Sequence, residues 1–262
     1  MHKEINLNIM GNEIEQMTID GPSLRIQLKG QAVRRFPLRT LGHICITGDP
    51  ANGADTLLAL MGKRKLITLF SANGVLKGQL YNPKKRESLL LNLLEESAHD
   101  PALAQARAEW FENSRLQAFA MVGITKGCDI MAIRSLRKQL GRTLSELDLK
   151  REHKTVTKWL RGITEICITK ILAKRGIPLH GHQCNRIRRQ LGRIAEPVYL
   201  HAALHWLVAN PAVETTPKNM TVVMGNFQRT LYPTLARCLY QLQVRLEQAI
   251  CTPTTMQKRK HR

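Results

Sequence analysis

The hydrophobic pattern of the chain changes period near residue 86, and this change limits the folds that the chain can adopt. Residues 17–80 alternate apolar and polar positions around turn signals such as Asp20-Gly21-Pro22, a pattern typical of strands. The clearest hairpin is predicted at residues 66–81, because Asn73-Gly74 supplies a turn that needs positive φ. This part of the chain is therefore predicted to form a β domain, with a short helix at residues 54–65.

Beyond residue 86 apolar residues recur three and four positions apart, which indicates amphipathic helices. The longest predicted helix covers residues 149–174 and is ended by Gly176-Ile177-Pro178. Its expected apolar side consists of Val156, Trp159, Leu160, Ile163, Cys167 and Ile171. Further helices are expected at residues 128–140, near 194–209 and 227–250, and in a segment that carries Leu103, Ala106, Trp110 and Phe111.

The predicted fold class is therefore α+β, with a small N-terminal β domain followed by an all-α C-terminal domain. The expected boundaries are a β domain at residues 1–82, a hinge at 83–100 and a helical domain at 101–250. The last residues, 251–262, are polar and basic and are expected to be disordered.

Positive charge accumulates in the second half of the chain. The whole protein of 262 residues has a formal net charge of +20. Residues 1–148 hold 20 Lys and Arg against 15 Asp and Glu, whereas residues 149–262 hold 20 against 5. Such a domain repels itself unless it meets a polyanion, and a phosphate backbone is the most common one. The charge predicts nucleic-acid binding; an anionic membrane surface or a merely basic soluble face are the alternatives.

Membrane-spanning and disulfide-rich classes do not fit the sequence. No run of about twenty apolar residues is present, and the first residues lack the apolar core of a signal peptide. The six cysteines are scattered without a Cys-x-x-Cys pair, which favours reduced thiols and a cytoplasmic location.

Two short motifs invite a functional interpretation that the residues do not complete. Residues 48–56, GDPANGADT, resemble a phosphate loop but lack its Lys-Ser/Thr, so a structural turn is favoured. His201 and His205 have a spacing that can hold zinc on a helix, but no Glu follows His201 as in a metalloprotease. Two ordinary helix histidines are the preferred interpretation.

A third group of residues has the chemistry of a divalent metal site. Glu152 lies near the start of the long helix, His180 and His182 follow its end, and Glu196 is expected at the start of the next helix. Carboxylates with an imidazole suit Mg²⁺ or Mn²⁺, which can activate a 3′-hydroxyl or a water against a phosphodiester. The alternative is that both glutamates simply stabilise helix N-termini.

The N-terminal half presents, in order, a hairpin, the strand FPLRTLGHICI, a short helix, the strand LITLFSANG and a Gly-x-Leu exit. In this ordered succession the sequence resembles the CRISPR adaptation integrase family, the first CRISPR-associated protein, also described as an endonuclease. RAEWFENSRLQAFAM is similar to the first helix of the family's α domain, so the resemblance covers roughly residues 17–122.

The resemblance implies a Mg²⁺- or Mn²⁺-dependent DNA endonuclease or integrase that acts in spacer acquisition during antiviral defence. The family holds its metal on a Glu, a His and a later acid. Glu152 in LSELDLKREHKTVTKW, His180 or His182 in GIPLHGHQC, and Glu196 in GRIAEPVY stand at the matching positions. The resemblance also implies a homodimer through the β domains and a complex with the small second adaptation protein.

The chain departs from the family around these residues, which leaves two hypotheses open. Only 27 residues separate Glu152 from His180, His153 replaces the glycine after the Glu, and no Asp follows Asp148. The first hypothesis is an active, shortened integrase with catalytic Glu152, His182 and Glu196. The second is a catalytically inactive nucleic-acid-binding scaffold of the same fold.

Both hypotheses predict contacts to backbone phosphates that do not depend on the base sequence. The expected contacts are Arg151, Lys154, Lys158, Arg161, Arg186, Arg188, Arg189 and Arg193. A third hypothesis, an unrelated RNA-binding or helix-turn-helix regulator, leaves the N-terminal β domain unexplained.

Overall fold

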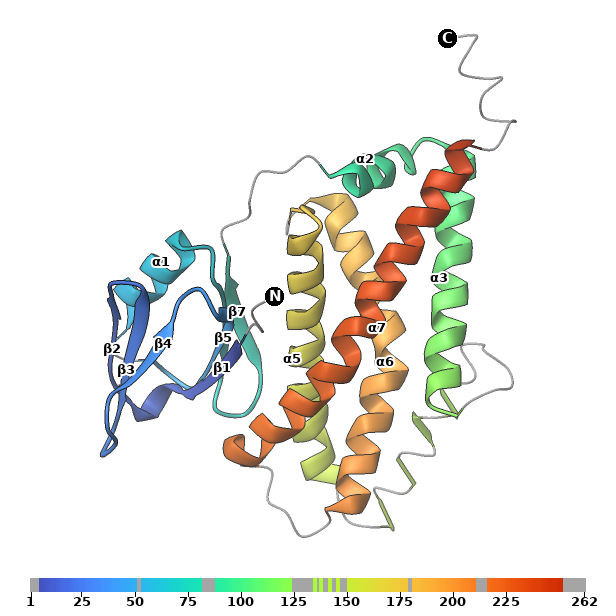
Figure 1. Cartoon of the computed structure of the whole chain (residues 1–262). Coiled ribbons are helices and arrows are strands. Elements are labelled where there is room, and N and C mark those ends of the chain that lie inside the picture. The colour runs from blue at the N-terminus through green and yellow to red at the C-terminus, as the bar shows by residue number, and fades with distance from the viewer. Residues whose placement is uncertain are drawn as a thin grey trace. The chain divides into compact units, whose positions relative to one another are not determined.

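The computed structural model describes residues 5–50, 53–81, 88–123, 150–178, 181–210 and 216–251, together with 134–135, 137–138, 141–142 and 145–146. The chain divides into two compact units, residues 1–83 with 214–222, and residues 84–213 with 223–262 (Figure 1). Strands occupy the first unit and long helices the second, which confirms the α+β class. Within the described ranges no helix is both long and apolar enough to cross a membrane.

Two small sheets form the N-terminal unit. The first has the order β1-β5-β6-β7 and the second the order β2-β3-β4. Their strands are β1 (Ile5–Met10), β2 (Ile14–Asp20), β3 (Ser23–Leu28), β4 (Arg34–Pro37), β5 (Leu41–Thr47), β6 (Leu66–Phe70) and β7 (Leu76–Leu80). A 3₁₀ turn, η1 (Gly11–Glu13), follows β1, and helix α1 (Ala54–Gly62) connects the parallel strands β5 and β6.

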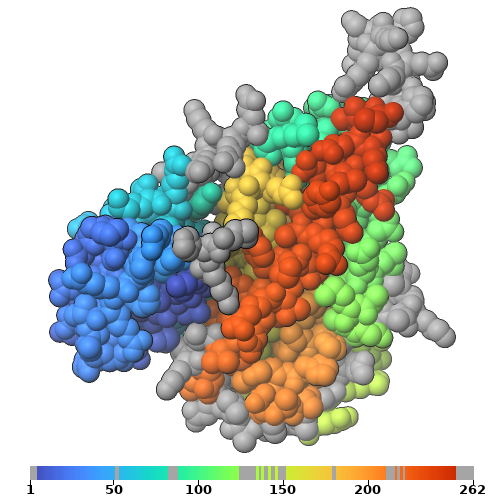
Figure 2. Space-filling view, viewed as in Figure 1, coloured from blue at the N-terminus to red at the C-terminus, as the bar shows by residue number. Residues whose placement is uncertain are grey.

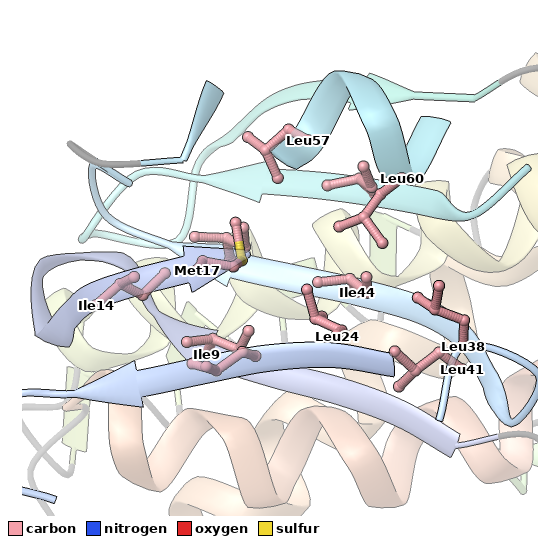
Figure 3. Packing of buried hydrophobic residues seen from close by; sticks show 12 residues of the cluster. Ile9, Ile14, Met17, Leu24, Leu38, Leu41, Ile44, Leu57 and Leu60 are labelled. Carbon is pink, nitrogen blue, oxygen red and sulfur yellow. The ribbon is translucent and has the colours of Figure 1, made fainter. Parts of the chain in front are cut away.

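The alternating residues of these strands form one apolar cluster. Ile9, Met17, Leu24 and Ile44 from four different strands point into the space beneath α1, and Leu60 enters it from the helix (Figure 3). The Thr56 hydroxyl at the start of α1 also donates to the Met17 carbonyl at 2.7 Å, which fixes the helix to β2. The predicted alternation corresponds to one buried side in β3, whereas β5 is buried at nearly every position.

The predicted hairpin at residues 66–81 is confirmed. Strands β6 and β7 pair antiparallel, and Gly74 has φ 78°, a conformation that side chains with a Cβ rarely adopt. The Ser71 backbone N–H donates to the Val75 carbonyl at 2.8 Å and closes the loop.

Long helices build the second unit: α2 (Leu89–Glu96), α3 (Pro101–Met121), α5 (Lys150–Lys174), α6 (His182–Ala209) and α7 (Pro217–Cys251). Asp100 caps α3 by accepting from the Ala102 backbone N–H at 2.8 Å, and Pro101 occupies the first turn, where a missing N–H costs nothing. The predicted helix at 149–174 is confirmed as α5, and its expected apolar side is buried. Gly176, with φ 71°, follows its end.

Two helix starts were predicted wrongly. Helix α6 begins at His182 rather than near 194, and α7 begins at Pro217 rather than near 227. Glu196 therefore lies inside α6 and not at a helix start. The first turns of α6 are rich in Arg, Gln and His, but Cys184, Ile187 and Leu191 still follow helical spacing and are buried. The N-terminal part of the 128–140 helix and the tail at 252–262 lie outside the described residues.

A buried arginine joins three helices of this unit. Arg107 on α3 is only 1% exposed. Its Nε donates to Gln190 at 3.1 Å, and its Nη1 donates to Gln183 at 2.9 Å and to Ser97 at 3.2 Å. Burial, and secondly the charge of Arg186, lower the pKa of Arg107 to about 10. The guanidinium therefore remains charged at neutral pH, with Nε and Nη1 bonded to side-chain oxygens and Nη2 buried without a hydrogen-bond partner among the described residues.

Candidate nucleic-acid interface

A groove lies along the packed helices α5 and α6. Helix α6 contributes residues spaced three and four apart, which places them on one side of the helix: Asn185, Arg188, Arg189, Gly192, Arg193, Glu196 and Tyr199. Helix α5 contributes Arg161, Thr164 and Glu165 from a single turn, and Arg137 completes the lining. The groove has a volume of about 680 Å³.

Arginine dominates the charge of this groove. Five arginines line it against two carboxylates, which leaves a net positive lining. Because guanidinium groups present several N–H donors in a planar fork, they bind phosphate oxygens well in a partly enclosed space. The lining therefore has the composition of an anion-binding groove.

Both carboxylates of the groove are held by arginines. Glu196 pairs with Arg137, and Glu165 pairs with Arg188 at 3.2 Å. Arg161, Arg189 and Arg193 are exposed and form no ion pair within the described part of the chain. These three cations are thus available to an incoming anion.

Tyr199 lies at the same side of α6 as Glu196. Burial raises the pKa of Tyr199, and the negative charge of Glu196 raises it further, while Arg161 and Arg137 act in the opposite direction. The phenol therefore stays neutral at physiological pH and offers a hydroxyl to the groove.

The predicted phosphate contacts fall into two groups. Arg161, Arg188, Arg189 and Arg193 line the groove, as does the predicted ligand Glu196. Lys154, Lys158 and Arg186 are exposed on α5 and α6 but are not part of the lining. Arg151 belongs to α5, but its side chain lies outside the described residues, as does His180.

The structure separates two of the predicted metal ligands. His182 is the first residue of α6 and Glu196 lies 14 positions later on the same helix. At 1.5 Å per residue they are about 21 Å apart along the axis, farther than Mg²⁺ with bonds of about 2.0–2.1 Å can bridge. His182 and Glu196 therefore do not share one metal ion, whereas the predicted site with His180 stays a prediction because His180 lies outside the described residues. Among the described residues no three His, Cys, Asp or Glu side chains could hold a metal ion.

Two charged residues of the groove were missed from the sequence. Arg137 belongs to a segment for which no binding role was predicted, and Glu165 lies in the middle of α5. Neither belongs to a motif. The useful signal for Glu165 was its position one turn beyond Arg161 on a helix with few acids.

The other two motifs lie on α6 and at the start of α1. The rings of His201 and His205 are 4.5 Å apart on α6, and no third ligand joins them within the described ranges. Gly53 is the N-cap of α1, which begins at Ala54, whereas residues 51–52 of the second motif lie outside the described residues.

Comparisons with known proteins support the fold expected from the resemblance. No family model matches the sequence, and no curated protein matches it. The structure is similar to a CAS1 protein from Thermotoga maritima, with a TM-score of 0.66 and 12% identity over 93% of this chain and 97% of that chain. It is also similar to a chain in a Cas6-RT-Cas1–Cas2 complex, with a TM-score of 0.64 and 12% identity over 95% of this chain and 35% of that one. A casposase bound to its integration product gives a TM-score of 0.58 and 14% identity over 92% and 91% of the two chains.

These similarities extend over both units of the chain. Because the identities lie between 12% and 14%, they establish a common fold, that of the Cas1 proteins and the casposase. Function has to be argued from the groove itself.

Proposed function

We propose that this protein is a DNA-binding CRISPR adaptation protein that holds backbone phosphates in the groove between α5 and α6. The observation that carries the proposal is the set of five arginines in one groove, three of them without an ion pair in the described structure. Phosphate contacts of this kind position a nucleic acid without reading its sequence. The integrase-type fold and the charge of the helical half support the same assignment.

The assembly belongs to the same proposal. A homodimer and a complex with a small second adaptation protein follow from the family resemblance, and one similar structure is a Cas6-RT-Cas1–Cas2 complex. Size-exclusion chromatography with light scattering, alone and with such a partner, tests both associations.

The groove is tested by removing two of its unpaired cations. Arg189→Gln/Arg193→Gln should weaken binding to all duplex sequences alike and reduce the slope of log K against log salt by roughly 0.9 for each phosphate that is no longer neutralised. Arg34→Gln/Arg39→Gln is the matched control, because it removes the same charge from exposed positions of the N-terminal unit. Fluorescence anisotropy over a salt series measures both quantities.

An equal loss of affinity in the two double variants would contradict the groove assignment, because only the total charge would then matter. The triple variant Arg186→Gln/Arg188→Gln/Arg189→Gln and its three single variants compare positions on one helix. Arg186 is exposed on α6 but does not line the groove, so Arg186→Gln should reduce DNA affinity the least of the three.

A second candidate function is metal-dependent DNA cleavage or strand transfer. The observation in its favour is that Glu196, a predicted ligand, lines the arginine groove together with Glu165. The described residues do not assemble a metal site, so a role for Mg²⁺ or Mn²⁺ rests on His180 in place of His182. If the activity exists, Glu152→Ala and Glu196→Ala each abolish Mn²⁺-dependent nicking of a labelled duplex without weakening DNA binding. Absence of nicking in the wild-type protein leaves the inactive scaffold as the function.

A further inference from the structure

Helix α7 carries two tyrosines, and each is faced by cations from the C-terminal end of α5 or the residue after it. The Nζ atoms of Lys170 and Lys174 lie 5.9 Å and 5.7 Å from the centre of the Tyr232 ring. The guanidinium carbon of Arg175 lies 5.7 Å from the centre of the Tyr240 ring. Tyr232 and Tyr240 are eight residues apart, about 12 Å along the helix.

Tyr240 also borders a cleft between α7 and α3. The cleft has a volume of about 250 Å³ and shares no lining residue with the arginine groove. Its lining is rich in side-chain amides, those of Asn113 and Gln117 on α3 and of Gln241 and Gln248 on α7. In Figure 1 α7 crosses the helical unit obliquely, and in Figure 2 its C-terminal part lies beside α3.

The cleft is held in shape by a strong contact at its floor. Trp110 is 1% exposed, and its Nε1 donates to the Cys238 carbonyl at 2.7 Å, which joins α3 to α7. Tyr240, by contrast, is 55% exposed. An accessible aromatic ring therefore stands beside side-chain amides on two helices that this hydrogen bond joins.

We infer that this surface, Lys170, Lys174 and Arg175 with Tyr232 and Tyr240 and the amide cleft, binds unpaired nucleotides of a nucleic-acid strand. Bases stack on tyrosine rings, amides bond to base edges, and the flanking lysines and arginines attract phosphates. The site rests on the proposed function, since it assumes a nucleic-acid ligand, but it is separate from the arginine groove in its residues and in its chemistry.

The chemistry favours a single strand over the other polyanions. In a duplex the edges of the bases are only partly accessible and their faces are stacked on each other, so the bases cannot stack on the two tyrosine rings. An acidic peptide would use the cations but would leave the amide cleft and the aromatic rings without a matching group. Bases and phosphates together occupy all three kinds of side chain.

The test compares three fluorescein-labelled ligands of equal length: an oligothymidylate, an abasic strand and a blunt duplex. The wild-type protein should bind the oligothymidylate more tightly than the abasic strand, because only the former has bases to stack. Tyr232→Leu/Tyr240→Leu should weaken oligothymidylate binding by at least about fivefold and leave abasic-strand and duplex affinities within about twofold. Tyr232→Phe/Tyr240→Phe keeps the stacking faces and should retain wild-type affinity.

The groove variant Arg189→Gln/Arg193→Gln separates this inference from the proposed function. It should weaken all three ligands and preserve the ratio between the oligothymidylate and the abasic strand. If it does so while the leucine variant keeps the wild-type ratio, the inference fails and the proposed function stands. If the groove variant changes nothing, the proposed function fails. Should the double leucine variant unfold, Tyr240→Leu alone, at the more exposed ring, decides the question by the same ratio.

Discussion

The two units differ in the polar side chains that are buried in their interiors. The N-terminal unit encloses an aliphatic cluster in which Leu24, Ile44 and Leu60 are fully buried. Its buried His43 and Thr68 satisfy each other across neighbouring strands at 3.0 Å. The helical unit instead encloses Arg107, the one fully buried Lys, Arg, Asp or Glu among the residues that the structure describes.

This difference predicts how each unit responds to substitutions in its interior. An aliphatic cluster is stabilised by the apolar area that it removes from water, and it tolerates replacement by side chains of similar volume. A buried guanidinium needs its acceptors in place, because an unpaired polar group in the interior costs free energy. The helical unit should therefore be the more sensitive of the two to shape-conserving substitutions.

The largest expected effect is the loss of volume in the N-terminal core. Leu60→Ala should lower the free energy of unfolding by about 2–5 kcal/mol, because it leaves a cavity between α1 and the sheets. Leu60→Met fills most of that volume and should cost less than about 1.5 kcal/mol. Urea unfolding monitored by circular dichroism gives both values, and equal losses in the two variants would show that this core is not simply aliphatic.

Arg107→Met applies the same shape-conserving change to the helical unit. The lowering of the Arg107 pKa from 12.5 to about 10 corresponds to about 3 kcal/mol against the charged form, which the substitution relieves. Against this, the oxygens of Gln183, Gln190 and Ser97 lose their donor, at about 1–3 kcal/mol each. Together the three lost bonds cost about 3–9 kcal/mol against the about 3 kcal/mol relieved, so we expect a net loss of stability that is larger than that of Leu60→Met. A variant as stable as wild type would remove the contrast between the two interiors.

The same contrast explains which features could be predicted from the sequence. Alternation predicted strands from residue 17 onward but not β1, Asn73-Gly74 predicted the hairpin, and the spacing of Val156, Trp159 and Ile163 predicted α5. The successful predictions all rest on local signals. The spacing of apolar residues in the sequence is enough to indicate which side of a helix or strand is buried. The hinge at residues 83–100 stays a prediction, although α2 lies within it.

The groove and the buried arginine could not be predicted in this way. Arg107 meets Gln183 and Gln190 at separations of 76 and 83 residues, and no local pattern encodes such a meeting. Placing Glu196 at a helix start made it look close to the histidines, whereas α6 is continuous from His182. The arginine cluster itself was visible as composition, but its partners Arg137 and Glu165 depend on how the helices pack.

Lowering the pH should reduce the free energy of unfolding of the helical unit by less than Leu60→Ala or Arg107→Met reduces it. Burial lowers the pKa of His153, and burial together with the charge of His205 lowers the pKa of His201. Below the unfolded value of about 6.5 the unfolded chain therefore binds more protons than the folded one, so stability is lost as pH falls through the folded pKa values. His201→Gln should flatten this dependence relative to wild type, with both proteins referenced to their stability near pH 8. A pH dependence unchanged by the substitution would assign the acid effect to other groups.

The smallest expected effect lies in the groove, where charge is compensated by ion pairs instead of by neutral amides. Glu196 neutralises Arg137 at a partly exposed position, and exposed or half-exposed pairs contribute only about 0.2–1 kcal/mol. Glu196→Gln keeps the shape of the side chain but releases Arg137 to bind phosphate, so duplex affinity should rise by roughly two- to fivefold. Glu112→Gln is the matched control, because Glu112 pairs with Arg115 on α3 outside the groove. A rise common to both variants would reflect total charge alone. A fall in affinity confined to Glu196→Gln would mean that the carboxylate itself contributes to binding, and would favour the metal-dependent function over the phosphate clamp.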